Sequence, residues 1–236
     1  MITLGIDTSG KTLSLALAKD RSILAEISLA LGYKHSITFQ PQVQALLSAC
    51  DLTLDQVDLF ALANGPGSFT GIRIGLAGVK AMAYATGART MAISSLRALA
   101  WSAGPFPGLT APLLDARGGR VYSSLFDQDQ ALIQEAPRPI PQLIQALIPY
   151  ADSGQAILVT GDGIGVLEKE AEALGDLPFR FLKAPAHSRF IRASAIIDLA
   201  LKDLADGQPT LDPFDLDASY VLASSAERAR EPGDDR

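Results

Sequence analysis

The segment from Gly5 to Thr12 is the first place where residue types and spacing could do chemistry. It reads GIDTSGKT, which matches the phosphate-binding pattern G-x4-G-K-T letter for letter. A loop of that kind binds phosphate because a helix follows it, with its first amide groups aimed at the anion. Here Thr12 to Ala18 alternates between leucines and small or polar residues, which predicts a strand. We therefore reject a P-loop and interpret the segment as a hairpin turn that Asp7 and Thr8 cap.

A second candidate lies between a predicted strand at Leu59 to Ala63 and a predicted helix at Thr70 to Ala85. It is a turn with the sequence GPGSFTG, formed by Gly65, Pro66, Gly67, Ser68, Phe69, Thr70 and Gly71. The turn fails the dinucleotide pattern G-x-G-x-x-G, because Thr70 stands where the third glycine belongs. Ser68 or Thr70 can cap the helix, and free amides at its start could hold an anion. We favour a structural turn that sets the angle of the helix.

The predicted helix from Thr70 to Ala85 is apolar on most sides. Glycines recur along it at helical spacing and form a groove that another element could approach closely; these are Gly71, Gly75 and Gly78. A helix of this kind is normally packed on two sides. We expect one side on a sheet and the other on the helix that carries Val43 to Cys50, on a partner subunit, or on both.

Isolated histidines and a lone cysteine give little support to metal or nucleophilic chemistry. His35 and His187 have no H-x3-H or H-E-x-x-H partner. Cys50 falls in an apolar helical pattern and is interpreted as a small buried hydrophobe. No serine, histidine and acid set stands out by spacing. The sequence thus predicts no catalytic residues and no metal site.

The elements around these motifs fall into two halves. Strands are predicted at 2–7, 12–18 and 23–30 as a meander, followed by a helix that Ser36 or Thr38 could cap. A strand at 59–63, a helix, a strand at 90–93 and a helix that Ser94 caps come next. The break GPFPG at 104–108 precedes a hairpin around Gly118 and Gly119, a helix at 141–148, a strand at 156–160 and two more helices. This order predicts a mixed α/β chain with lobes at 1–104 and 105–223 and a flexible tail at 224–236. We expect the helix at about 189–206 to pack back on the first lobe.

Bulk composition limits the class of protein. The chain has 236 residues, 48% hydrophobic residues and a formal net charge of −6. The Lys and Arg residues are scattered, so direct, unaided RNA binding is not expected. The sequence shows no signal peptide and no stretch apolar enough to span a bilayer, so we expect a cytoplasmic protein with no membrane partner.

Several motifs, in order, resemble the TsaB family, formerly called YeaZ. They are NGPGSFTGIRIG at 64–75, GIDTSGKTLSLAL at 5–17, KHS at 34–36, ISSLRALA at 93–100 and DARGGRVY at 115–122. The resemblance implies an actin-like fold of the Hsp70, actin and sugar-kinase (ASKHA) superfamily, with a reduced second lobe. In that superfamily the turn between the first two strands contacts nucleotide phosphates. The resemblance therefore makes candidates of Asp7, Thr8, Ser9, Gly10 and Lys11, beside the plain hairpin interpretation.

The same resemblance implies a role in tRNA threonylcarbamoylation (t6A) at adenosine 37. TsaB is similar to TsaD, the catalytic subunit, whose H-x3-H metal pair would align with Ser95 and Leu99 here. Since neither residue is an imidazole ligand, the resemblance implies a non-catalytic scaffold or activating subunit. It implies TsaD and TsaE as partners, which would hold the ATP and the metal, contact with tRNA only through the complex, and a homodimer as an alternative when the chain is alone.

The resemblance also implies that the first-lobe helices contact TsaD. The candidates at that interface are Ile37, Pro41, Val43, Gln44, Leu47, Gly71, Ile72, Gly75, Leu76, Gly78, Val79 and Met82. Two other functions stay open on the sequence: an actin-like ATP-binding enzyme that acts through Asp7, Thr8 and Asp115, and an M22-type metallopeptidase homologue.

Overall fold

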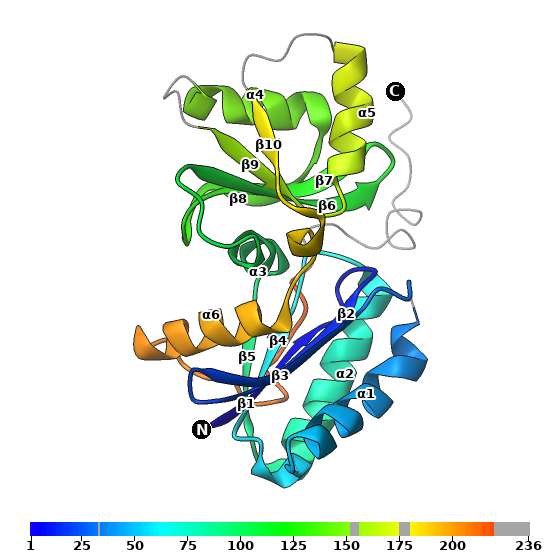
Figure 1. Cartoon of the computed structure of the whole chain (residues 1–236), viewed down its shortest axis with the longest axis vertical. Helices are drawn as coiled ribbons and strands as arrows, with labels where there is room; N and C mark the ends of the chain where they lie inside the picture. The colour runs from blue at the N-terminus through cyan, green and yellow to red at the C-terminus, as the bar shows by residue number, and fades with distance from the viewer. Residues whose placement is uncertain (33, 152–155, 175–179, 220–236) are drawn as a thin grey trace, which may run out of the picture.

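Two five-stranded sheets of the same plan form the centre of the molecule, as a computed structural model shows (Figure 1). The structure describes residues 1–32, 34–151, 156–174 and 180–219. The first sheet has the order β3-β2-β1-β4-β5 and contains β1 (Ile2–Asp7), β2 (Leu13–Lys19), β3 (Ser22–Leu29), β4 (Leu59–Ala63) and β5 (Arg89–Ile93). The second has the order β10-β9-β6-β7-β8 and contains β6 (Leu109–Arg117), β7 (Arg120–Asp127), β8 (Gln130–Pro139), β9 (Ile157–Thr160) and β10 (Phe181–Lys183).

Each sheet combines an antiparallel meander with two parallel strands. In the first sheet β1 pairs antiparallel with β2 and parallel with β4, and β4 pairs parallel with β5. In the second sheet β6 takes the place of β1, with β7 antiparallel and β9 parallel beside it. The meander of the first sheet and the alternating strands and helices after it confirm the prediction, whereas in the second half only the hairpin of β6 and β7 was predicted and β8 completes the repeat.

Helices cover both faces of the first sheet. They are α1 (His35–Ala49) and α2 (Phe69–Thr86) on one face and α6 (Ala193–Ala205) on the other, with α3 (Ser95–Ser102) against both α6 and the second sheet (Figure 1). The second sheet carries α4 (Ile140–Ala151) and α5 (Ile164–Leu174), and short 3-10 turns lie at Leu54–Gln56 and Ala186–Ser188. Within the described residues, no helix is both long and apolar enough to cross a membrane.

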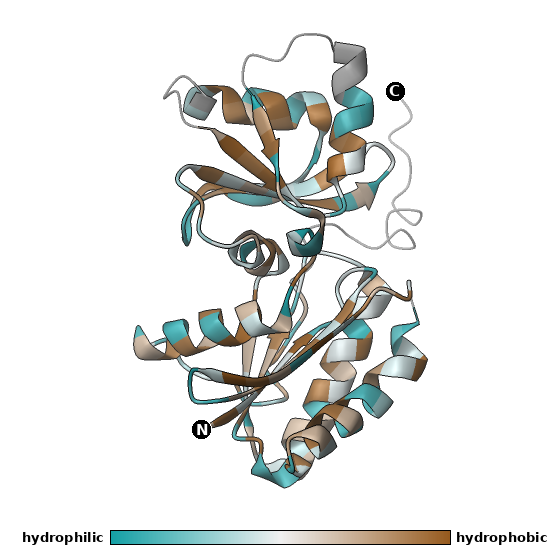
Figure 2. Ribbon diagram, viewed as in Figure 1, coloured by the Kyte–Doolittle hydropathy of each residue, from teal (hydrophilic) through white to brown (hydrophobic). Residues whose placement is uncertain are grey.

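Alternation in the strands sorts large from small side chains between the two faces of the first sheet. Leu13, Leu15 and Leu17 of β2 join the core under α1 and α2, whereas Ala16 and Ala18 join the core under α6. Both cores consist of buried apolar side chains, and the strands are mostly brown in Figure 2. Small side chains on the second face allow α6 to lie close to the sheet, as the period of two requires.

Two strands and one helix cap differ from the prediction. β8 was missed because Pro137 and Pro139 argue against a strand, yet β8 lies at the edge of its sheet, where proline is tolerated. β10 has only three residues, too few for a periodic signal. A cap of α1 by Ser36 or Thr38 was wrong: the helix begins at His35, and its N-cap residue, Lys34, makes no side-chain cap hydrogen bond.

The two predicted lobes correspond in sequence to the two sheets. The predicted boundary at residue 104 falls between α3 and β6, and α6 lies against β1 and β2 of the first sheet. These boundaries stay a prediction, and the predicted tail at 224–236 lies outside the described residues. Below, the first lobe means the first sheet with α1, α2, α3 and α6, and the second lobe means the second sheet with α4 and α5.

Candidate functional site

The two motifs that the sequence singled out lie against each other. One follows β1 and the other follows β4; these strands are parallel neighbours, so their carboxyl ends meet at one edge of the sheet. The backbone amide of Ser68 donates to the Ser9 carbonyl oxygen at 2.6 Å, and the Thr8 hydroxyl donates to the Gly71 carbonyl oxygen at 2.8 Å. We call this junction of residues 7–11 with residues 65–71 the turn junction.

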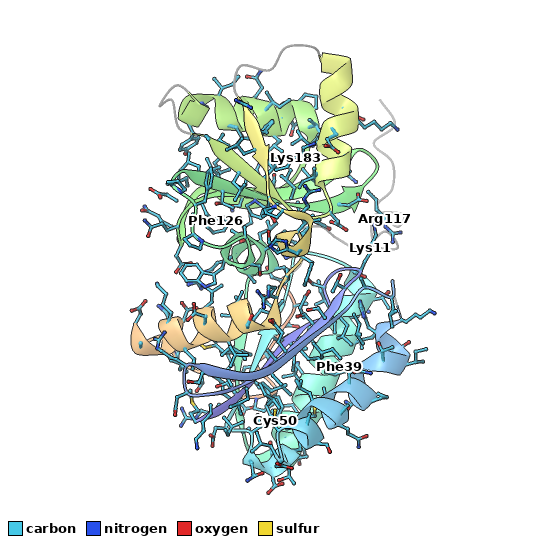
Figure 3. The ribbon with its side chains drawn as sticks, viewed as in Figure 1. Lys11, Phe39, Cys50, Arg117, Phe126 and Lys183 are labelled. Carbon is cyan, nitrogen blue, oxygen red and sulfur yellow. The ribbon has the colours of Figure 1, made fainter. Side chains whose placement is uncertain are left out.

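Glycines of α2 make the turn junction possible. A Cβ atom on Gly71 would lie 2.0 Å from the Thr8 carbonyl oxygen, and one on Gly75 would lie 2.3 Å from the Thr8 hydroxyl. One turn further along, a Cβ atom on Gly78 would lie 2.3 Å from the ring of Phe39 on α1 (Figure 3 labels this ring). The predicted glycine groove thus exists, and Thr8 and Phe39 of this chain fill it.

Asp7 is buried at the centre of the junction. Its Oδ1 atom accepts hydrogen bonds from the backbone amide of Ser9 at 2.8 Å and from the Ser9 hydroxyl at 2.6 Å. Burial raises the pKa of Asp7 from 3.8 to about 6, and the two Ser9 hydrogen bonds offset part of that rise. Only 2% of Asp7 is exposed, so in this conformation the carboxyl group is closed off from solvent.

His35 supports the same turn from the side. Its ring Nε2 atom lies 2.7 Å from the carbonyl oxygen of Gly10, which can only accept, so Nε2 carries the proton. The ring is buried at the first residue of α1. This contact ties α1 to the β1–β2 turn and gives the lone histidine a structural role.

Three of the amide groups in these two turns are engaged within the chain. Ser9 donates to Asp7, Ser68 donates to Ser9, and Gly71 donates to the Ser68 hydroxyl at 3.3 Å. Of the five candidates for phosphate contact, Asp7, Thr8 and Ser9 are buried, Gly10 is half-buried and Lys11 is exposed. Lys11 reaches across to Asp162 of the second lobe at 3.8 Å (Figure 3 labels Lys11). A phosphate contact stays a prediction, and these contacts favour the structural interpretation of both turns.

The predicted cap of α2 is confirmed in part. Ser68 is the N-cap residue and accepts from the Gly71 amide, whereas Thr70 lies inside the helix. The predicted cap of α3 is also confirmed, since the Ser94 hydroxyl accepts from the Arg97 amide at 3.2 Å.

Most of the twelve residues expected at a partner interface are buried within this chain. The buried ones are Val43, Leu47, Gly71, Ile72, Gly75, Leu76, Val79 and Met82, and Gly78 is half-buried. Ile37, Pro41 and Gln44 are exposed. Their place at an interface stays a prediction. The inward-facing side chains of α2 pack on the first sheet and on α1, so a partner would contact the outer side of these helices.

A shallow pocket and an aromatic pair lie beside these two helices. A pocket of about 460 Å³ beside α1 is lined in part by Val43, Gln44, Leu47 and Met82. At the far end of α2, Tyr84 and Phe214 are each about 70% exposed, with ring centroids 5.5 Å apart. This pair was not predicted from the sequence, because Phe214 is distant from Tyr84 along the chain. An aromatic residue on the polar side of α2 could have drawn attention to Tyr84.

The positions that would carry a metal pair are part of the core. Ser95 and Leu99 on α3 are fully buried, and the Ser95 hydroxyl accepts from the Gly65 amide at 3.1 Å. Across the ranges described above, no group of three or more His, Cys, Asp or Glu residues is placed to hold a metal ion. Cys50 is only half-buried, at the C-cap of α1, so its prediction as a buried residue was wrong.

Comparisons with known proteins point the same way as the motifs. A family model described as "TsaD: tRNA N6-adenosine threonylcarbamoyltransferase" matches residues 29–191. The Bacillus subtilis "tRNA threonylcarbamoyladenosine biosynthesis protein TsaB" is 38% identical over 135 residues, which cover 57% of this chain and 59% of that protein. The chain thus spans little more than half the length of this curated relative.

Solved structures extend the likeness over nearly the whole chain. "YeaZ from Pseudomonas aeruginosa" superposes with a TM-score of 0.78 at 26% identity, covering 93% of this chain and 99% of that one. The ethanolamine utilization protein EutJ from Carboxydothermus hydrogenoformans has a TM-score of 0.52 at 13% identity, with 83% and 89% covered, which shows the fold alone. The predicted actin-like α/β fold is confirmed.

Proposed function

The chain belongs to the TsaD family of proteins, in its TsaB/YeaZ branch, and from that premise we propose that it is a non-catalytic subunit in threonylcarbamoylation of tRNA adenosine 37. In this role it docks on a TsaD-type catalytic subunit, with the ATPase TsaE joining, and contacts tRNA only as part of the complex. ATP and metal are held by the partners, and the work takes place in the cytoplasm.

The observation that carries the non-catalytic role is the environment of Ser95 and Leu99. A catalytic metal pair at the start of α3 needs two imidazoles that face an open space. Here the Ser95 hydroxyl accepts from a buried backbone amide, and Leu99 lies in the core. Neither position can donate a ligand without taking apart the packing of α3, which supports a subunit that does no metal chemistry of its own.

The outer sides of α1 and α2 are the proposed docking surface. Ile37 on α1 is 70% exposed, as is Tyr84 on α2, so each presents a large side chain that a partner could cover. On α2 the exposed Ala77 and Ala81 lie between Tyr84 and the start of the helix. Small residues there allow close approach of a partner helix. A homodimer through the same surface is the competing state when the chain is alone.

A reconstituted reaction tests the proposal. The chain is mixed with TsaD-type and TsaE-type subunits of one species, ATP, threonine, bicarbonate and the enzyme that makes the adenylate, and modified tRNA is measured by mass spectrometry. Ile37→Asp should abolish co-purification with the catalytic subunit and reduce modification. Leu24→Asp is the matched control, because Leu24 is an exposed leucine that lies on β3 and on neither helix.

Failure has a clear form. If the wild-type chain neither co-purifies with the catalytic subunit nor stimulates modification, the proposal is wrong. If the isolated chain binds ATP and hydrolyses it in calorimetric and phosphate-release assays, the chain is an enzyme in its own right. That alternative gains no support from the turn junction, where Asp7 and Thr8 are buried, and the metallopeptidase alternative gains none from Ser95 and Leu99.

A further inference from the structure

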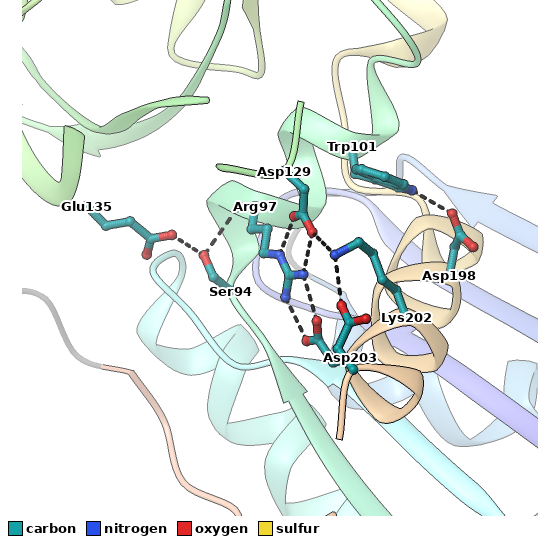
Figure 4. Close-up of polar contacts among 9 residues, drawn as sticks. Ser94, Arg97, Trp101, Asp129, Glu135, Asp198, Lys202 and Asp203 are labelled. Atoms are coloured by element: carbon teal, nitrogen blue, oxygen red, sulfur yellow. Dashed lines mark hydrogen bonds and ion pairs between the residues drawn. The ribbon is translucent and has the colours of Figure 1, made fainter. Parts of the chain in front are cut away.

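Four charged side chains from three separate segments meet between the two lobes (Figure 4). Arg97 comes from α3, Asp129 from the turn between β7 and β8, and Lys202 and Asp203 from α6. We call these four residues the Arg97 cluster. Because Asp129 belongs to the second lobe and α6 packs on the first sheet, the cluster connects the lobes through side chains.

Arg97 forms bidentate hydrogen bonds with two carboxylates, those of Asp129 and Asp203. Its Nε and Nη2 atoms donate to the two oxygens of Asp129 at 2.6 and 2.8 Å. Its Nη1 and Nη2 atoms donate to the two oxygens of Asp203, both at 2.7 Å. Four of the five guanidinium N–H groups are thereby used, and since the guanidinium is planar and rigid, the two carboxylates are held at a set angle.

Lys202 completes the balance of charge. Its Nζ atom lies 2.9 Å from Asp129 and 3.1 Å from Asp206, one turn further along α6. The cluster therefore has two cations, Arg97 and Lys202, and two largely buried carboxylates, those of Asp129 and Asp203. Hydrogen bonds from Arg97 and Lys202 hold the pKa of Asp129 below its usual value, against the opposing effect of burial.

Partial burial makes these ion pairs stronger than ordinary surface pairs. The side chains of Arg97, Asp129 and Asp203 are 22%, 15% and 17% exposed. The other pair between the lobes that joins Lys11 to Asp162 is 56% and 35% exposed and longer, at 3.8 Å. Screening by water makes such an exposed pair contribute little. The Ser94 hydroxyl also donates a hydrogen bond to Glu135 of β8, so among the described residues the Arg97 cluster carries most of the ion pairing between the lobes, with this one hydrogen bond beside it.

Apolar packing alone would leave the orientation of the lobes loosely defined. One hydrophobic core extends from the first lobe into the second. In it, Leu96 and Leu99 of α3 and Ile196 of α6 pack together with Leu114 and Phe126 of the second sheet. Burial of this surface favours contact, but it is non-directional. Bidentate hydrogen bonds add the direction that the apolar contact lacks.

We infer that the Arg97 cluster is a latch, made of this chain's own side chains, that holds the two lobes in one relative orientation. The inference does not depend on the proposed function, because it concerns only contacts within the chain. It predicts that the angle between the lobes is a property of α3, α6 and the β7–β8 turn. It also predicts that loosening the cluster lets one lobe turn against the other while the core under α1 and α2 and the core under α4 and α5 stay intact.

Distances between spin labels test the latch directly. Cys50→Ser removes the native thiol, and Gln56→Cys and Gln142→Cys place one label on the exposed surface of each lobe. With the cluster intact, pulsed electron paramagnetic resonance should give one narrow distribution of distances between the two labels. Arg97→Lys keeps the positive charge but loses the bidentate hydrogen bonds to Asp129 and Asp203, so the distance distribution should broaden and its mean should shift. Asp129→Asn keeps the side-chain shape and should give the same change, smaller in size.

Arg21→Met is the matched control. Arg21 also pairs with a carboxylate of α6, Asp198, but at 3.5 Å, on the surface and within the first lobe. This variant should leave the distribution as it is in the parent protein. If Arg97→Lys and Asp129→Asn, both folded by circular dichroism, give the parent distribution, the latch is wrong. If Arg97→Lys fails to fold, Asp129→Asn alone decides between the two results.

Discussion

The turn junction and the Arg97 cluster hold together parts of the chain that are distant in sequence, but by opposite means. At the turn junction, backbone atoms of residues 8–9 touch backbone atoms of residues 67–71, and absent side chains permit it. At the Arg97 cluster, long charged side chains span the space between α3, α6 and the β7–β8 turn. A backbone contact has no freedom to adapt, whereas a side-chain contact can change its rotamers. The first should therefore tolerate almost no substitution, and the second should lose its effect in steps.

Gly71→Val should have the largest effect. Even the first carbon of a side chain would lie 2.0 Å from the Thr8 carbonyl oxygen, so the backbone must move. We expect a loss of about 3 kcal/mol or more in the free energy of unfolding, as for severe overpacking, measured by urea titration. Gly10→Ala is the control, since nothing lies within 4 Å of its added carbon. Equal stability of Gly71→Val and Gly10→Ala would contradict the role of the glycines.

Arg97→Met should have the next largest effect. It leaves the partly buried carboxylate of Asp203 without the guanidinium of Arg97, and among the described residues it leaves Asp129 with Lys202 as its remaining ion-pair partner. Breaking a buried pair in this way costs about 3 to 5 kcal/mol when burial is complete, and partial exposure should bring the loss in unfolding free energy to about 2 kcal/mol. The same urea titration measures it. Arg21→Met should change the free energy by no more than about 0.5 kcal/mol, and a similar loss in both variants would remove the distinction.

Asp7 should give the turn junction a dependence on pH. Its pKa is raised from 3.8 to about 6 in the folded protein, so the folded state binds more protons than the unfolded state between these values. The stability from this group is complete below pH 3.8 and is lost as pH rises through 6. Asp7→Asn keeps the Oδ1 acceptor for Ser9 and removes the charge. Relative to the wild-type protein it should gain on the order of 2 kcal/mol in unfolding free energy between pH 4 and pH 8. A difference that does not vary with pH would show that Asp7 is not closed off.

Lys11→Gln should have the smallest effect on stability. It tests whether the exposed Lys11–Asp162 pair holds the lobes less firmly than the Arg97 cluster does. Lys11 and Asp162 are exposed and 3.8 Å apart. We expect a change of no more than about 0.5 kcal/mol and an unchanged distance distribution between labels at positions 56 and 142. A large shift in that distribution would instead show that the contact of Lys11 with Asp162 sets the angle between the lobes.

Much of the local structure could be predicted from the sequence. The alternation of Leu13, Leu15 and Leu17 predicted both a strand and its inward face, and that strand ruled out the P-loop. Ser68 and Ser94 were predicted as helix caps from their positions before apolar periodic segments. These features depend on neighbours within a few residues, so local patterns are sufficient to find them.

Less of the candidate site could be predicted. The glycine spacing of α2 indicated a close approach but not the identity of the approaching group, which is Thr8 in one case and Phe39 in the other. As a result, apolar residues such as Ile72 and Val79 were assigned to a partner although they lie in the core. Exposure depends on which elements pack together, and a single-chain pattern does not contain that information.

By itself, the sequence determined the resemblance to the family, most of the strands and helices, and the two turns that follow β1 and β4. Only the tertiary structure decided that these turns form one junction, that His35 supports it, and that Arg97 meets Asp129 and Asp203. The physical reason is separation along the chain. Residues 97 and 203 are brought together by the packing of α3 on α6, so their pairing follows from the fold and leaves no local signal in the sequence.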